Sequence, residues 1–162
     1  MSKNLADFGI NFRSEEQETF KFLTESDWRL LLEKAERVSY PQGQAIIEEG
    51  AKRKAIFVVQ NGTVRVERAA PDSMPALLAQ FGPGAVFGEM SFLEDRGASA
   101  AVLAGTAVDL YVIEDVYVHS LLMSVSGFAT RFYHSLAVTL ARRLRESSDR
   151  LSRLNLNAPF GV

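Results

Sequence analysis

The middle of the chain carries short runs in which apolar and polar residues alternate, separated by turn-forming residues. Alternation with a period of two predicts β-strands, and turns at this spacing are typical of a small β-barrel or jelly roll. Val64 and Val66 alternate with Arg65 and Glu67, so one face of the sheet is polar and antiparallel pairing is expected. The segment Gln60–Thr63 (QNGT) predicts a hairpin, because Asn-Gly supplies the two positive φ angles of a type I′ turn. The predicted strands are Ala45–Ile47, Ala55–Gln60, Thr63–Arg68, Pro75–Phe81, Ala85–Phe87, Ser99–Ala104 and Val108–Ile113.

The residues before these strands carry helix-start signals. Ser14–Gln17 has the spacing of a capping box and predicts a short helix that continues through Phe20 and Leu23. Thr24 or Ser26 is suited to cap a second helix, because both residue types accept hydrogen bonds from the first helical N–H groups. The apolar face of this second helix consists of Trp28, Leu31, Leu32 and Ala35.

After the last strand the pattern changes to the helical period. Asp115–Met123 predicts one short helix, and Ser126 can cap a longer helix over Gly127–Leu154. A stripe of Phe128, Phe132 and Leu136 is expected to pack on the strands. A second face has strict 4-3 spacing and consists of Tyr133, Ala137, Leu140, Leu144, Ser147, Leu151 and Leu154. This face is either a dimer seam, which we favour, or the apolar side of a helix that packs only on its own domain.

Length, charge and cysteine content narrow the class of protein. The 162 residues suit one domain, organised as an arm (1–13), helices with the β-structure (14–126), a long dimerisation helix (127–154) and a tail (155–162). Without cysteine there is no disulfide, which agrees with a reducing compartment. No apolar run reaches the roughly 18 residues of a membrane span, so a cytoplasmic protein is expected.

The long predicted helix is basic, although the whole chain has a net charge of −2. The segment 131–153 carries six arginines against Glu146 and Asp149, which gives it a charge of +4. Such a run on a dimer helix is more often a solvated face than a grip on phosphates. The residues from Asn155 to Val162 are too few for a helix-turn-helix module, so no sequence-specific DNA binding is expected.

The stretch from Phe87 to Ala104, FGEMSFLEDRGASAAVLA, carries the candidate chemistry. Gly88 lets the backbone approach a ligand closely, and Glu89 places a carboxylate beside it. Unpaired N–H groups at the start of a short helix favour an anion. A carboxylate next to an anion site is explained if it accepts a hydrogen bond from a ligand hydroxyl.

This stretch resembles the phosphate-binding cassette of the cyclic-nucleotide-binding domain family, which has the pattern F-G-E-x-(A/S)-(L/F)-L, a short loop and R-(A/S/T)-A-(S/T)-V. The resemblance implies that Glu89 accepts the ribose hydroxyl and that Ser99 helps to hold the phosphate. The phosphate-pairing arginine of the family falls on Ala98, and Arg96 either reaches back to the phosphate or is a solvated loop charge. The implied site residues are Phe87, Gly88, Glu89, Met90, Ser91, Arg96, Ala98, Ser99 and Ala100.

The resemblance extends over about Thr24 to Leu154 and implies a mainly-β α+β fold. This fold is an eight-stranded antiparallel β-roll, jelly-roll-like, with short N-terminal helices and a long C-terminal helix. The implied function is a stand-alone regulatory domain that senses a cyclic mononucleotide (cAMP or cGMP) and relays it through its C-terminal helices to a protein partner. The alternative is a degenerate β-roll that binds no ligand and serves dimerisation or protein interaction.

The remaining residue types argue against catalysis and metal binding. No nucleophile–base pair or pair of catalytic carboxylates stands at a recognisable spacing, so the chain is not expected to be an enzyme. His119 and His134 lie on different predicted helices without a cysteine or acidic cluster at ligand spacing, so no metal site is expected.

Overall fold

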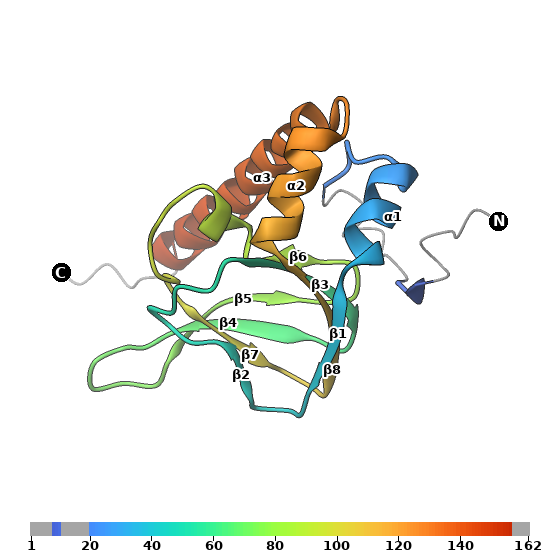
Figure 1. The fold of residues 1–162 in the computed structure, drawn as a ribbon. Helices are drawn as coiled ribbons and strands as arrows, with labels where there is room; N and C mark the ends of the chain where they lie inside the picture. The colour runs from blue at the N-terminus through green and yellow to red at the C-terminus, as the bar shows by residue number, and fades with distance from the viewer. Residues whose placement is uncertain (1–7, 11–19, 157–162) are drawn as a thin grey trace.

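Two four-stranded antiparallel sheets face each other and form a β-roll (Figure 1). A computed structural model describes residues 8–10 and 20–156 of the chain. The strand order is β1-β8-β3-β6 in one sheet and β2-β7-β4-β5 in the other. The strands are β1 (Glu36–Tyr40), β2 (Ala45–Ile47), β3 (Ala55–Asn61), β4 (Val64–Arg68), β5 (Ala76–Phe81), β6 (Val86–Phe87), β7 (Ala101–Ala104) and β8 (Val108–Glu114). The predicted eight-stranded antiparallel roll is confirmed.

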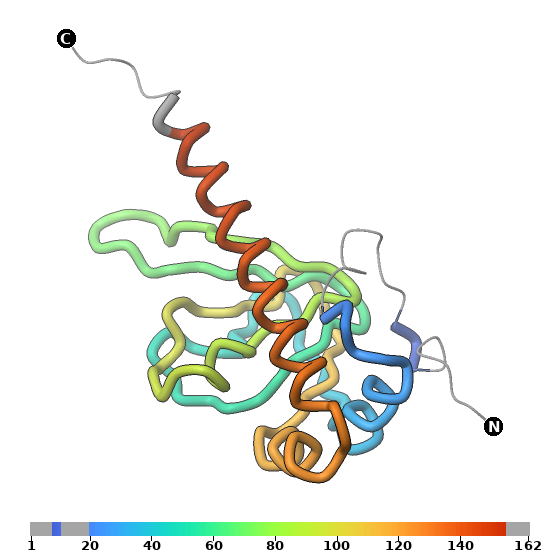
Figure 2. The backbone as a smooth tube through the Cα atoms, turned by 90° about the horizontal axis from the view of Figure 1, so that it is seen from above, coloured from blue at the N-terminus to red at the C-terminus, as the bar shows by residue number. Residues whose placement is uncertain are grey.

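The helices gather on the outer side of the β1-β8-β3-β6 sheet (Figure 1). They are α1 (Glu25–Glu33), α2 (Asp115–Ser124) and α3 (Phe128–Leu156), and a one-turn 3₁₀ helix, η3 (Glu89–Phe92), follows β6. Seen from above, α3 crosses the whole body and its distal end projects past the roll (Figure 2). The first half of α3 is therefore part of the domain core, whereas its last turns extend beyond it.

Strand β3 lies between two hydrophobic clusters, which explains its unbroken apolar sequence. Phe57 and Val59 point into the cluster between the two sheets. Ile56 and Val58 point to the opposite side, into the cluster under the helices. A strand that is buried on both faces reads as a continuous apolar run rather than as an alternation.

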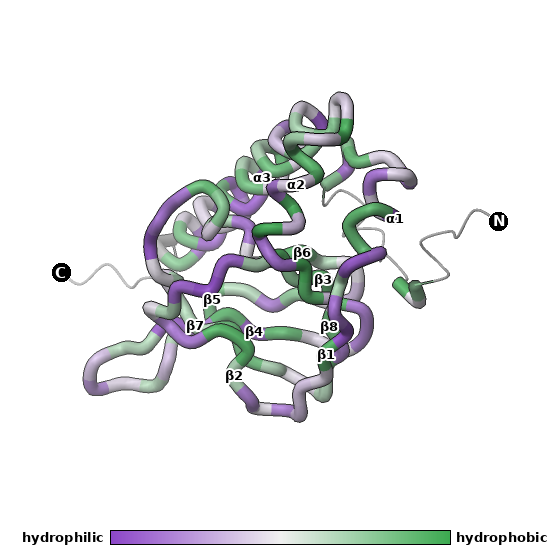
Figure 3. The backbone as a smooth tube through the Cα atoms, viewed as in Figure 1, coloured by the Kyte–Doolittle hydropathy of each residue, from purple (hydrophilic) through white to green (hydrophobic). Residues whose placement is uncertain are grey.

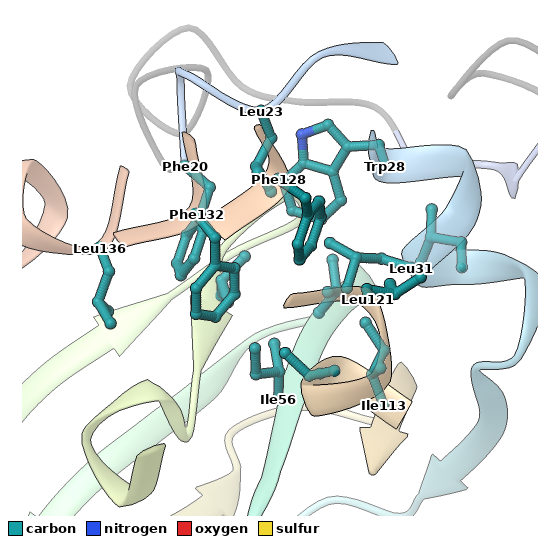
Figure 4. Close-up of a cluster of buried hydrophobic side chains, with 14 of the residues drawn as sticks. Phe20, Leu23, Trp28, Leu31, Ile56, Ile113, Leu121, Phe128, Phe132 and Leu136 are labelled. Carbon is teal, nitrogen blue, oxygen red and sulfur yellow. The ribbon is translucent and has the colours of Figure 1, made fainter. Parts of the chain in front are cut away.

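The cluster under the helices is built around aromatic rings (Figure 4). Phe132 is fully buried, and its ring centroid lies 5.5 Å from that of Phe20 and 5.8 Å from that of Phe128. Phe92 of η3 contacts the same ring edge-on at 6.2 Å. The predicted stripe of Phe128, Phe132 and Leu136 is thus confirmed, and Phe132 joins α3 to the segment that carries the candidate site.

The predicted hairpin at Gln60–Thr63 is wrong. Strand β3 pairs with β6 and β8, whereas β4 pairs with β5 and β7, so the chain crosses between the two sheets at this point. Gly62 has a φ of 80°, but Asn61 is not among the residues with positive φ, so no type I′ turn forms. The glycine is needed because a Cβ there would lie 2.2 Å from the carbonyl oxygen of Ala107.

The region before β2 differs from the prediction in three ways. Phe20, with a φ of 52°, and Leu23 lie in a turn and not in a helix, and the predicted capping box at 14–17 falls outside the described residues. Strand β1 was not predicted, because only Val38 and Tyr40 of its five residues face the core between the sheets. Ile10, in the expected arm, is buried in the cluster under the helices.

A partly buried ion pair fixes α1 to α3. Thr24 caps α1, and Asp27 and Thr24 exchange the two hydrogen bonds of a capping box. Asp27 also receives two hydrogen bonds from the Arg131 guanidinium, at 2.6 and 2.7 Å. Burial opposes ionisation of Asp27, but the hydrogen bonds from Arg131 and Thr24 outweigh it, so the pKa of this carboxyl lies below its usual value.

We expect this pair to make the stability depend on pH. Because the folded-state pKa of Asp27 is lowered, its contribution is present above the unfolded-state pKa of about 3.9 and is lost as pH falls through the folded-state pKa. Asp27→Asn exchanges charge-assisted hydrogen bonds for neutral ones and should cost about 1–1.5 kcal/mol at pH 7. Urea unfolding between pH 3 and pH 7 should show that the free energy of unfolding falls more steeply with acid in the unmodified chain than in Asp27→Asn. Equal acid loss in both proteins would contradict this, and Asp149→Asn at an exposed position is the control.

Candidate functional site

A cavity of about 770 Å³ lies between the roll and α3. Its volume falls in the range of small-molecule sites, which is roughly 300–1,000 Å³. Its walls come mainly from the segment after β6, strand β5 and the second half of α3, and the β2–β3 loop, β4 and β7 add further residues. All the site residues implied by the sequence resemblance line it, namely Phe87, Gly88, Glu89, Met90, Ser91, Arg96, Ala98, Ser99 and Ala100.

Gly88 sets the position of the short helix η3 against the roll. Its φ of 84° is in the left-handed region that favours glycine. A Cβ at Gly88 would lie 2.4 Å from the carbonyl oxygen of Ala55 and 2.9 Å from Cδ2 of Phe57. The Ser91 hydroxyl donates to the Gly88 carbonyl at 2.6 Å and closes the turn. Only glycine therefore allows this backbone to rest directly on β3.

Glu89 is 3% exposed and forms an ion pair with Arg143 of α3. One amino group of the Arg143 guanidinium donates to Oε1 of Glu89 and the other to the carbonyl oxygen of Val86. The guanidinium also lies over the ring of Phe81, 4.6 Å from its centroid. Arg143, in the second half of α3, therefore bridges η3, strand β6 and strand β5 at the cavity wall.

Sequence reasoning did not find Arg143, because it placed all six basic residues of the helix on a solvated face. Arg143 and Arg150 lie seven residues apart and so share one face of α3. Arg150 donates to the carbonyl oxygen of Leu78 in β5, and both arginines line the cavity. The seven-residue spacing of two arginines beside the apolar seam is the signal that could have revealed them.

Ala98 lines the cavity without a charged side chain, at the position where the resemblance places the phosphate-pairing arginine. The amide of Ala98 donates to the Ala51 carbonyl at 2.9 Å, and its own carbonyl accepts from Gly50 N–H at 2.7 Å. The Arg96 side chain is 82% exposed and stands 3.9 Å from the Glu94 carboxylate. This placement at the cavity rim fits the interpretation of Arg96 as a solvated loop charge.

The described ranges 8–10 and 20–156 contain neither a cluster of metal ligands nor a helix that could span a membrane. Within them, no three His, Cys, Asp or Glu side chains are grouped so that they could hold a metal ion. Among the helices of that part of the chain, none combines the length and apolarity needed to cross a membrane.

The chain belongs to the cyclic nucleotide-binding domain family, whose sequence model matches residues 37–125, more than half of the chain. It is 34% identical to the cyclic AMP receptor protein of Thermus thermophilus over 136 residues, which are 84% of this chain and 61% of that protein. It is 30% identical to cyclic GMP-binding protein C of Dictyostelium discoideum over 123 residues, 76% of this chain and 5% of that protein.

Solved structures show the same relationship. The crystal structure of the Thermus thermophilus catabolite activator protein superimposes with a TM-score of 0.71 at 33% identity, over 85% of this chain and 63% of that chain. The chain thus spans less than two thirds of the length of each of these three relatives. The β-roll with a long closing helix is therefore a shared fold, and the relatives are named as nucleotide receptors, binding proteins or activators.

Proposed function

We propose that this chain is a regulatory domain that binds a cyclic mononucleotide, cAMP or cGMP, in the cavity between the roll and α3. The observation that carries the proposal is that one cavity is bounded on one side by the cassette with buried Glu89 and on the other by α3. The volume of the cavity is ample for one nucleotide. The names of a cyclic AMP receptor and a cyclic GMP-binding protein among the relatives support the same ligand class.

In this proposal Glu89 accepts a hydrogen bond from the ribose hydroxyl and keeps accepting the one that Arg143 donates. The backbone near Gly88–Met90 and at Ser99 lies against the phosphate. Among the described residues, the buried Nε–H of Arg143 has no acceptor, and a ligand oxygen in the cavity would satisfy it. The α3 side of the cavity adds Ser147, whose hydroxyl is a candidate partner for the base.

The proposed output is a shift of α3. Arg143 and Arg150 hold α3 to the cavity, and Phe132 holds it to the core. A change at the cavity can therefore alter how α3 packs on the core. A ligand that engages Glu89 alters the contact with Arg143 and therefore the population of α3 positions. The domain would pass this change to a partner domain or chain, and its role is regulatory rather than catalytic.

Isothermal titration calorimetry with cAMP and cGMP tests the proposal. At least one nucleotide should bind, and Glu89→Gln should weaken it, because an amide is a poorer acceptor for a hydroxyl than a carboxylate. Adenosine and guanosine serve as phosphate-free controls. If neither cyclic nucleotide binds at about 1 mM, where ΔG is only about −4 kcal/mol, the proposal fails. The chain would then be a β-roll that serves dimerisation or protein interaction.

We also propose that two copies pair through the seam on α3. Leu144 and Leu151 are 69% and 61% exposed, and Leu154 is likewise exposed. Hydrophobic and hydrophilic residues interleave along α3, and the helix runs past the body of the domain (Figures 2 and 3). Three leucines at 4-3 spacing on a projecting helix match the geometry of a two-stranded coiled coil.

The double variant Leu144→Glu/Leu151→Glu is expected to be monomeric, because it places four carboxylates in the apolar seam of the pair. Light scattering coupled to size-exclusion chromatography measures the mass. The protein concentration of about 50 µM is well above the dissociation constant expected for a stable pair. Val116→Glu, at an exposed apolar position on α2 outside the seam, should leave the dimer intact. A monomeric unmodified chain under these conditions would contradict the pairing.

A further inference from the structure

The loop between β2 and β3 carries three consecutive basic residues, Lys52, Arg53 and Lys54, beside the uncharged cavity wall at Ala98. The carboxylate of Glu89 already takes Arg143 as its partner, so a phosphate in this cavity needs a further cation of its own. We propose that Arg53 is this cation and that it binds the phosphate of the nucleotide. The inference rests on the proposed function and names one further specificity residue of that same site.

The loop that carries Arg53 is fixed to the Ala98 segment by its backbone. The hydrogen bonds between Gly50 and Ala98 and between Ala98 and Ala51 measure 2.7 and 2.9 Å. A Cβ on Gly97 would lie 2.4 Å from the Gly50 carbonyl oxygen, so the two segments touch without room for a side chain. In Figure 1 the β2–β3 loop and the start of β7 meet at the same edge of the roll. Arg53 follows this contact by two residues.

The Arg53 side chain lies at the wall of the cavity, above strand β3. Arg53 lines the cavity together with Gly88, Glu89 and Ala98. Its guanidinium carbon lies 6.0 Å from the ring centroid of Phe57, the ring on which the Gly88 backbone rests. The guanidinium therefore stands over the same strand that supports the cassette.

The present partner of Arg53 can be exchanged for a ligand. Nη2 of Arg53 lies 2.6 Å from Oε1 of Glu114, but the two side chains are 51% and 57% exposed. Exposed ion pairs contribute little to stability. A phosphate in a partly enclosed cavity offers a bidentate, charge-assisted contact that water screens less. Binding should therefore transfer Arg53 from Glu114 to the phosphate.

The other cations that line the cavity are less suited to this role. Arg143 and Arg150 are hydrogen-bonded to the roll on the α3 side. Arg96 projects into solvent at the rim beside Glu94. Lys54, next to Arg53 in sequence, does not line the cavity and pairs with Asp95 at 3.1 Å. Arg53 thus combines a place on the Ala98 side of the cavity with a partner that is easily replaced.

Calorimetry with cAMP and cGMP tests Arg53 directly. Arg53→Ala should weaken binding by about 10- to 150-fold, the range for one hydrogen-bonded charge. Arg53→Lys should restore only part of this, because lysine lacks the bidentate fork. Glu114→Gln should tighten binding, because it releases Arg53. Lys52→Ala, a neighbouring change of the same charge, is the matched control and should stay within about twofold. Binding to Arg53→Ala within twofold of the unmodified chain would overturn the inference while the proposed function stands.

A second measurement tests whether Arg53 binds phosphate independently of whether the chain binds a nucleotide. In ¹⁵N-labelled protein, inorganic phosphate should shift the signals of the Arg53 Nε–H and the Ala98 amide, and Arg53→Ala should abolish the shift at Ala98. If the unmodified chain binds neither cyclic nucleotide but shows these phosphate shifts, the proposed function fails and the Arg53 anion site stands. If phosphate leaves both signals unchanged and no nucleotide binds, both are wrong.

Discussion

Replacing Phe132 by alanine should lower the free energy of unfolding by about 3–5 kcal/mol, the usual cost of removing a buried aromatic ring. Phe132 is fully buried, and its ring contacts those of Phe20 and Phe128 (Figure 4). The ring of Phe92 contacts it edge-on. These rings come from the N-terminal turn, from η3 and from α3 itself, so they cannot collapse into the vacated space without moving whole elements. The cavity cost should therefore lie at the upper part of the range rather than be relieved by local rearrangement.

Urea unfolding and thermal melting measure this loss. For a chain of this size, 1 kcal/mol corresponds to about 2–4 °C in Tm, so a fall of about 6–20 °C is expected. Met123→Ala, at a strongly exposed position on α2, is the matched truncation and should stay within about 0.5 kcal/mol. A loss below about 1 kcal/mol in Phe132→Ala would show that the aromatic cluster does not hold the helices on the roll.

The parts of the fold that follow from local periodicity were predictable from the sequence. The stripe of Phe128, Phe132 and Leu136 has helical spacing and lies fully buried, as expected. The strands between Ala45 and Ile113 were predicted with boundaries close to the observed ones, since each has its own alternation or apolar run. Burial on one or two faces leaves a direct mark in sequence.

The pairing of the strands could not be predicted from the local sequence pattern. The Asn61-Gly62 dipeptide has the composition of a hairpin turn, yet the chain there passes from one sheet to the other. The choice between the two depends on what Gly62 approaches, and that is the backbone at Ala107, more than forty residues later in the chain. Strand β1 was missed for a related reason, because its polar residues face solvent at a sheet edge.

The site shows the same division. The residues from Phe87 to Ala100 that the resemblance implied are close in sequence, and the structure places all of them on one cavity. Arg143 and Arg53 reach that cavity from α3 and from the β2–β3 loop. The spacing of Arg143 and Arg150 indicates only that they share a helix face, and Arg53 has no such signal, since an arginine on an amphipathic helix and one in a basic loop are both normally solvated. Only the tertiary arrangement assigns them to the site.

Introducing an arginine at position 98 should raise the affinity for a cyclic nucleotide. Ala98 lines the cavity, so the new guanidinium would extend from the wall toward the phosphate. A hydrogen-bonded charge pair contributes about 1.5–3 kcal/mol, or about 10- to 150-fold in affinity. Calorimetry with cAMP and cGMP measures the gain, and Ala98→Gln is the control of similar length without the charge. Failure of both Ala98→Arg and the unmodified chain to bind at about 1 mM would show that the cavity does not accept a nucleotide.

The gain should depend on Arg53, and a double-mutant cycle measures this dependence. In Arg53→Ala, the introduced arginine would be the only phosphate cation on that wall and should give the full gain. In the unmodified chain, Arg53 already neutralises the phosphate and would repel the guanidinium introduced at position 98. Ala98→Arg should therefore raise the nucleotide affinity clearly less in this background. Equal gains in both backgrounds would mean that Arg53 does not touch the phosphate. A larger gain with Arg53 present would mean that the two arginines bind different oxygens of the phosphate and act together.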